Sequence, residues 1–224
     1  PLENREIADT RDLVNALAKS QRVVNHCMIT PNIDTALQLD LMGQVHAERG
    51  VAAWKCYTQF SLTGGGFWLD DPTTRIPFVE KARSLGVELV CVHKGLPFSG
   101  PNPLYASAED VGRVAKLFPD VSFLVYHSAY RASGGSTEGP YDAANPIGVD
   151  SLLKSLEDSG IGPNQNVYAG LRSTWREIMS NPVNEDAWEW IEVRNTGPAP
   201  VDLNGYIIDR LGDALPTTIN PGVQ

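Results

Sequence analysis

Two stretches of this chain decide its fold: Val87–Phe98, with the sequence VELVCVHKGLPF, and Val121–Tyr130, with the sequence VSFLVYHSAY. Each is an apolar run, rich in β-branched residues, that ends in a histidine. Such a run predicts a buried parallel strand of an α/β protein. Because ligands gather at the carboxyl ends of parallel strands, we expect His93 and His127 to lie where a site is usually built.

The chemistry of imidazole gives these two positions their interest. Histidine is the commonest side-chain ligand of zinc and the usual general base near neutral pH. Either His93 or His127 could instead cap its strand and hydrogen-bond within the fold. Two equivalent placements on successive strands make a shared chemical role as well supported as two separate structural ones.

The alternation of strand and helix extends outward from these stretches over most of the chain. A helix is expected over residues 3–21, with Ile7, Leu13, Val14 and Leu17 on one side. Strands are expected at 22–30, 51–58, 87–93, 121–127 and 166–171. Helices are expected between them from Asp34 to Arg49, up to Gly86, from Ser107 to Pro119 and over 148–159. This pattern excludes an antiparallel sandwich and leaves an open doubly wound sheet or part of a (β/α)₈ barrel.

Composition narrows the classes of partner. The 224 residues include 18 Lys and Arg against 27 Asp and Glu, a net charge of −9, with no basic cluster for a phosphate backbone. The sequence has no apolar run long enough to span a bilayer. We therefore expect neither nucleic acid nor a membrane as a partner. The three cysteines, Cys27, Cys56 and Cys91, match no zinc or redox motif and are expected in the core.

The pattern changes near residue 187. The segment WEWIEVR at 188–194 alternates apolar and polar residues with period two, which indicates a half-buried antiparallel strand. A turn at 195–198 and a second strand in VDLNGYIID complete a predicted hairpin over 188–209. We place a domain boundary within 182–186, which separates an α/β domain over 1–182 from a short all-β tail over 187–224.

Several segments carry a resemblance to a known family. These are WKCYTQ, GGGFWLDDP, IPFVEKARSLGV, VCVHKGLPFSG, FPDVSFLVYHS and GPNQNVYAGLRSTWREIM. They resemble metal-dependent amidohydrolases of the amidohydrolase-2 type, a group that includes the aminocarboxymuconate-semialdehyde decarboxylase-like enzymes. The resemblance covers residues 20–182 and implies a partial (β/α)₈ TIM-barrel-like parallel sheet with outer helices. Val87–His93 would then be strand five and Val121–His127 strand six.

The resemblance also implies roles for particular residues. In this family an HxH pair on strand one, a histidine on strand five and an aspartate on strand eight hold a divalent metal, usually zinc. The strand-six histidine contacts the metal or the reacting water. His93 would therefore be a metal ligand, and His127 a second ligand or the general base. Lys55, on strand four, would bind substrate or pair with an acid; a carboxylated lysine bridging two metals is the other role of this position.

This sequence departs from the family pattern at two points. It contains no HxH motif, since His26 and His46 stand alone, and the tail begins where strands seven and eight should follow. The zinc site is therefore expected to be incomplete, because zinc needs three or four protein ligands. Asp70, Asp71 and Asp142 are the first candidates to complete it.

Residues beside the histidines have simpler interpretations. Lys94 follows His93 and should point to the opposite face of the sheet, and Tyr126 should likewise face away from His127. The triplet Gly64–Gly66 lacks the Lys-Ser/Thr of a P-loop and reads as a flexible loop. The Asp70–Asp71 pair suits the start of the next helix better than a metal site.

The tail has a resemblance of its own. EWIEVRNTG and VDLNGYIID resemble the opening strands of a lamin-tail-type domain, an immunoglobulin-like sandwich appended to many secreted bacterial enzymes. An unrelated hairpin packed on the barrel is the alternative. The barrel part is typical of a cytoplasmic enzyme and the tail of a secreted or cell-surface one. The chain starts at Pro1 without an initiator methionine, as a fragment or processed form would.

The sequence observations support two functions. The first is a hydrolase or decarboxylase that acts on a small carbonyl or amide-type substrate, with activity impaired by the incomplete zinc site. The second is a non-catalytic remnant that serves as a binding or structural module.

Overall fold

The computed structural model describes residues 2–59, 65–96, 103–131, 138, 141–171 and 174, and the short segments 201–202 and 218–219. Its main element is a five-stranded parallel sheet, in which the spatial order of the strands follows their order in the chain. The strands are β1 (His26–Met28), β2 (Ala53–Tyr57), β3 (Leu89–His93), β4 (Ser122–Tyr126) and β5 (Val167–Ala169). The expected α/β class with a parallel sheet is confirmed.

Helices connect the strands as the sequence predicts. They are α1 (Leu2–Ala18), α2 (Thr35–Arg49), α3 (Ile76–Ser84), α4 (Val111–Leu117) and α5 (Val149–Ser159), with short 3₁₀ turns η1 (Pro103–Ala106) and η2 (His127–Ala129). The ends of α2 follow the expected chemistry. Asp34 accepts a hydrogen bond from the Leu37 N–H, and Gly50 ends the helix with a positive φ of 60°.

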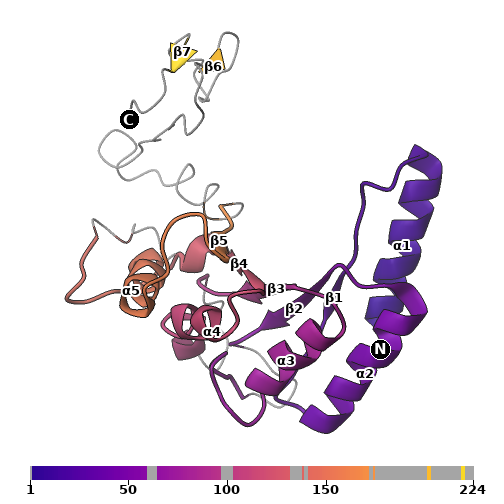
Figure 1. Ribbon diagram of the computed structural model, residues 1–224, viewed down its shortest axis with the longest axis horizontal. Helices are drawn as coiled ribbons and strands as arrows, with labels where there is room; N and C mark the ends of the chain where they lie inside the picture. The colour runs from indigo at the N-terminus through magenta and orange to yellow at the C-terminus, as the bar shows by residue number, and fades with distance from the viewer. Residues whose placement is uncertain are drawn as a thin grey trace. The chain divides into compact units, whose positions relative to one another are not determined.

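The hydrophobic core lies between one face of the sheet and the helices, and Figure 1 shows α2, α3 and α4 gathered on that side. The strands contribute Cys27, Trp54, Cys56, Val90, Val92, Phe123 and Val125, and the helices contribute Met42, Val45, Phe78, Val79, Ala82, Val111, Val114 and Leu152. All three cysteines are buried and unbridged, as predicted.

The other face of the sheet has a different character. Strand register places Met28, Lys55, Cys91 and Leu124 in one row across β1 to β4. The next row towards the carboxyl ends holds Tyr57, His93 and Tyr126. None of these residues belongs to the hydrophobic core cluster of the described chain. Lys55, Tyr57, His93 and Tyr126 make this face more polar and more aromatic than the face that carries the core.

Helix α1 differs from its expected orientation. Leu13 and Leu17 were predicted on a common apolar side, and the structure leaves them 60% and 76% exposed. Polar residues attach the helix instead. The side chain of Asn4 donates to the Met28 carbonyl and accepts from the Met28 N–H, and so occupies backbone groups that an edge strand leaves open.

The chain divides into two compact units, Pro1–Val183 and Asn184–Gln224. In the second unit Val201–Asp202 (β6) pairs antiparallel with Thr218–Ile219 (β7). The predicted strand at 188–194 and its turn lie outside the described residues, as does nearly all of the helix begun by STWREIM. Within the described part, no helix is long and apolar enough to cross a membrane.

Candidate active site

His93 and His127 lie together at the carboxyl ends of β3 and β4. Their ring centroids are 4.6 Å apart with the planes inclined by 67°. His93 is the last residue of β3 and is 2% exposed, and the ring of Tyr57 stacks on it at 5.0 Å. The two histidines that the strand-ending pattern placed at one end of the sheet are thus in ring contact.

The backbone at His127 is unusual. Sequence analysis placed this residue in the strand, whereas β4 ends at Tyr126 and a left-handed turn begins. His127, Ser128 and Ala129 have φ values of 62°, 50° and 62°, a conformation that non-glycine residues rarely adopt. The surrounding structure holds the turn in place, since Thr174 Oγ1 donates to the His127 carbonyl at 2.6 Å and Ser128 Oγ donates to Gly170 at 3.1 Å.

Because His127 lies past the end of the strand, the expectation that Tyr126 faces away from the site is wrong. Tyr126 pairs in register with His93. Its ring lies 3.4 Å from Lys55 Nζ, and its hydroxyl is 3.3 Å from Nδ1 of His26. Alternation along β4 correctly places the side chains of Tyr126 and Val125 on opposite faces of the sheet. It does not predict the direction of the His127 side chain, because His127 lies in the left-handed turn after the strand. Sequence reasoning therefore missed this residue.

Lys55 lies between two aromatic rings on the same face. Its Nζ is 3.4 Å from the ring centroid of Tyr126 and 4.8 Å from that of Tyr57. The side chain is 6% exposed, and its amino group has no hydrogen-bond partner in the described part of the chain. Lys55 is therefore part of the candidate site. It forms no ion pair with any described acidic residue.

The electrostatics of this group of residues are dominated by burial. Desolvation, together with the charge of Lys55 and then His127, lowers the pKa of His93 to about 3. Desolvation also lowers the pKa of Lys55 to about 8, and the cysteine thiols beside it counteract part of that shift. The pKa of His26 is lowered as well, first by burial and then by Lys55. His93 is accordingly a neutral imidazole at neutral pH, the form that binds metal.

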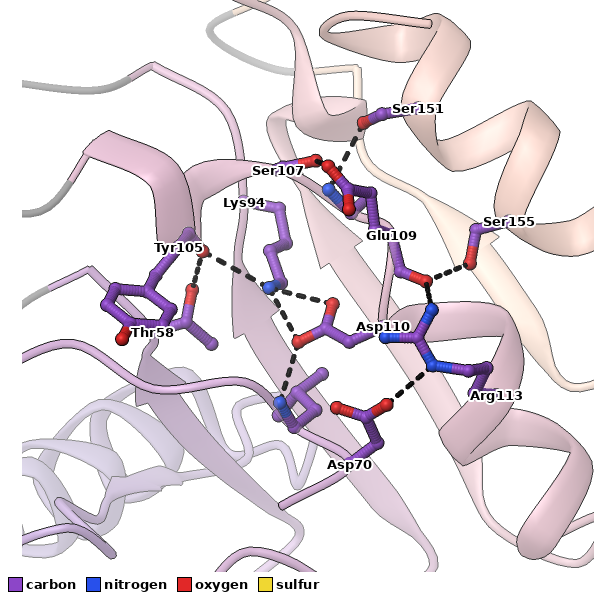
Figure 2. A network of polar contacts seen from close by, with 12 residues as sticks. Thr58, Asp70, Lys94, Tyr105, Ser107, Glu109, Asp110, Arg113, Ser151 and Ser155 are labelled. Carbon is purple, nitrogen blue, oxygen red and sulfur yellow. Dashed lines mark hydrogen bonds and ion pairs between the residues drawn. The ribbon is translucent and has the colours of Figure 1, made fainter.

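A buried polar network supports the end of β3 from the side facing away from Lys55. Figure 2 shows the ammonium of Lys94 pointing at the carboxylate of Asp110, 2.8 Å away, with neither side chain exposed. Asp110 also accepts the Leu69 N–H at 2.6 Å, and Thr58 Oγ1 donates to the His93 and Tyr105 carbonyls. The structural role predicted for Lys94 is confirmed, whereas its partner Asp110 was not foreseen.

The described residues do not complete a metal site. They contain no group of three or more His, Cys, Asp and Glu side chains that could hold an ion. The candidates named from sequence are engaged elsewhere: Asp70 pairs with Arg113, and Asp71 accepts the N–H groups of Thr73 and Thr74. Asp142 accepts the N–H of Ala144 in a turn.

A pocket of about 410 Å³ lies beside the segments that follow β3 and β4, and neither His93 nor His127 is among its lining residues. Gly95 and Ala129, each two residues beyond a site histidine, line it together with η1 residues and the charged residues Glu109 and Arg131. Gly95 and Ala129 pack so closely that a Cβ at position 95 would lie 2.3 Å from the carbonyl carbon of Ala129. The segments that follow β3 and β4 therefore meet at the wall of this pocket.

Comparisons with known proteins add no relative: no family model, curated protein or solved structure matches the chain.

Proposed function

We propose that residues 1–182 are part of a (β/α)₈ barrel of the amidohydrolase type, and that they carry half of the active site of a metal-dependent hydrolase or decarboxylase. The observation that supports this most is the ring contact of His93 with His127, 4.6 Å between centroids, at the ends of adjacent parallel strands. A barrel enzyme builds its site at this end of the strands.

The two imidazoles provide the right donor chemistry for zinc but too few donors. A catalytic zinc ion takes three protein ligands and a water molecule, and it activates that water or polarises a carbonyl. His93 and His127 would supply two nitrogens. The remaining ligands would have to come from residues outside the described part of the chain, or from a longer protein. We therefore propose weak zinc binding by this chain alone.

The chain's own side chains suggest how a substrate would be held. The amino group of Lys55 would bind the oxygen of a carbonyl or carboxylate, and His127 would take a proton as general base. We propose no nucleic-acid or membrane partner.

Zinc titration of the purified chain tests the proposal. We expect substoichiometric zinc by mass spectrometry of the metal content and no turnover of simple amides. Binding should weaken further in His93→Ala. His46→Ala is the matched control. This histidine lies in the last turn of α2, which leads through Gly50 to the amino end of β2, whereas His93 lies at the carboxyl end of β3.

Three outcomes would change the conclusion. Equal zinc binding in the wild type and in His93→Ala would remove His93 from the metal site. Stoichiometric, tightly held zinc with hydrolysis that His93→Ala abolishes would show that other residues complete the site. A chain that binds zinc in neither form would favour the alternative, a non-catalytic binding or structural module.

A further inference from the structure

Helix α1 lies beyond β1, at one end of the sheet (Figure 1), and side-chain amides attach it there. Besides the pair that Asn4 forms with the N–H and carbonyl of Met28, Asn15 donates to the Val23 carbonyl at 2.9 Å and accepts from the Val23 N–H at 3.1 Å. The two asparagines are 4% and 6% exposed, and Ala8 between them is completely buried. Each asparagine thus makes both hydrogen bonds that a residue of a neighbouring strand would make.

The spacing of the two asparagines matches the edge that they cover. Asn4 and Asn15 are about three helical turns apart, so both lie on one face of α1 and about 16 Å apart along its axis. An extended segment from Val23 to Met28 spans about the same distance, at about 3.3 Å per residue. Helix α1 therefore runs antiparallel to this segment and covers its whole length.

Polar rather than apolar contacts hold α1 in place. No described residue of α1 belongs to the hydrophobic core cluster, and Leu13 and Leu17 stay exposed. Arg11 adds hydrogen bonds to the Asn25 side chain and to the Arg49 carbonyl, both at 2.9 Å. A helix that buries so little apolar surface can open locally while the sheet stays folded.

The edge beneath α1 is suited to pairing with a copy of itself. Asn25 and Ile29 direct their backbone groups to β2, where the Asn25 carbonyl accepts a hydrogen bond and the Ile29 N–H donates one. The alternate residues Val24, His26 and Met28 therefore direct theirs to the outer edge. In an antiparallel pair centred on His26, each of these residues would exchange hydrogen bonds with its counterpart in a second copy.

The charge of the segment favours a second copy of this chain as the partner. Residues 23–33 contain no Asp, Glu, Lys or Arg, although the chain has a net charge of −9. Two copies can therefore meet at this edge without like charges opposite each other, whereas many edge strands carry charges that prevent such pairing. We propose that the β1 edge is a pairing surface for the β1 edge of a second copy, and that α1 is a displaceable cap that keeps this surface closed. The inference goes beyond the proposed hydrolase function, because it requires neither zinc nor His93.

Sedimentation velocity of the full chain tests the proposal with a variant that removes the two amides. Asn4→Leu with Asn15→Leu cannot bond the edge, and we expect this double variant to self-associate at least about ten-fold more tightly than the wild type. Asp12→Leu with Ala16→Leu is the matched control, because it adds two leucines at exposed positions of α1 and keeps both asparagines. The control should associate as the wild type does.

A proline identifies the surface that pairs. Val24→Pro removes an outward N–H of the edge, so adding it to the double asparagine variant should return self-association to the wild-type level. The proposal is overturned if the double variant associates no more tightly than the wild type, or if the control associates as tightly as the double variant. Association that survives the proline would overturn it as well.

Amide hydrogen exchange of the wild type provides a test that needs no folded variant. The N–H groups of Val23 and Met28 donate to the asparagines of α1, so opening of α1 alone should release them. We expect both amides to exchange at least about ten-fold faster than those of Val90 and Val92 in the central strand β3. Exchange at the β3 rate would show that α1 leaves only when the sheet unfolds, and the cap would not be displaceable.

Discussion

The imidazole of His26 on β1 lies 3.3 Å from the hydroxyl of Tyr126 on β4, although β2 and β3 separate the two strands. In a flat sheet three strand spacings would put their backbones about 14 Å apart. The contact therefore requires the sheet to curve towards the face that carries His26, Lys55 and Tyr126. The proposed barrel needs curvature in this direction, and the same curvature brings Lys55 on β2 over the ring of Tyr126.

The first prediction concerns the contact between the ends of β3 and β4. Gly95→Ala adds a Cβ that would lie 2.3 Å from Ala129 at a φ of +71°. Gly86→Ala is the matched control, because Gly86 has the same φ of +72° and open space around it. We expect the control to lose about 1–2 kcal/mol of unfolding free energy and Gly95→Ala about 1–3 kcal/mol more, measured by chemical denaturation. Equal losses would mean that the contact with Ala129 has no energetic weight.

The second prediction concerns the buried ion pair. Asp110→Ala leaves the Lys94 ammonium buried without its carboxylate and should cost about 3–5 kcal/mol. The double variant Lys94→Met with Asp110→Leu should lose much less than the sum of the single changes. A double-mutant cycle by denaturant unfolding measures this coupling. In the exposed pair Lys154–Asp158, Asp158→Ala should cost less than about 0.5 kcal/mol.

The third prediction concerns pH. Because the pKa of His93 is about 3 in the folded chain and near 6.5 when unfolded, the unfolded state binds the extra proton between these values. Stability from this group is complete above pH 6.5 and is lost as the pH falls towards 3, by at most about 1.4 kcal/mol per pH unit. His93→Asn should flatten the dependence of unfolding free energy on pH between 6.5 and 4. Parallel curves for variant and wild type would contradict the burial of a neutral imidazole.

The fourth prediction concerns Cys91, whose small side chain lies in register between Lys55 on β2 and Leu124 on β4. Cys91→Leu adds bulk in this row, and should displace the amine from the ring and cost about 1–3 kcal/mol. Cys91→Ala adds no bulk and should preserve the tyrosine signal in near-ultraviolet circular dichroism. If the leucine variant leaves that signal unchanged, Lys55 does not reach across β3 as the structure has it.

Much of the fold could be predicted because the signals are local. Each buried strand is a short apolar run, and Asp34 and Gly50 bound α2 through their own side-chain and backbone chemistry. The adjacency of His93 and His127 was also predictable, since successive parallel strands of a βα unit end at the same edge. The apolar side of α1 was a misleading signal, because Asn4 rather than Leu13 or Leu17 attaches that helix.

The sequence by itself determined the order of strands and helices, the burial of the cysteines and the edge of the sheet where the histidines lie. Only the tertiary structure decided what surrounds them. Periodicity cannot show that β4 ends in a left-handed turn before His127, that Asp110 neutralises Lys94, or that curvature brings His26 to Tyr126. These relationships depend on where distant segments meet in space, and local propensity and alternation carry no information about that.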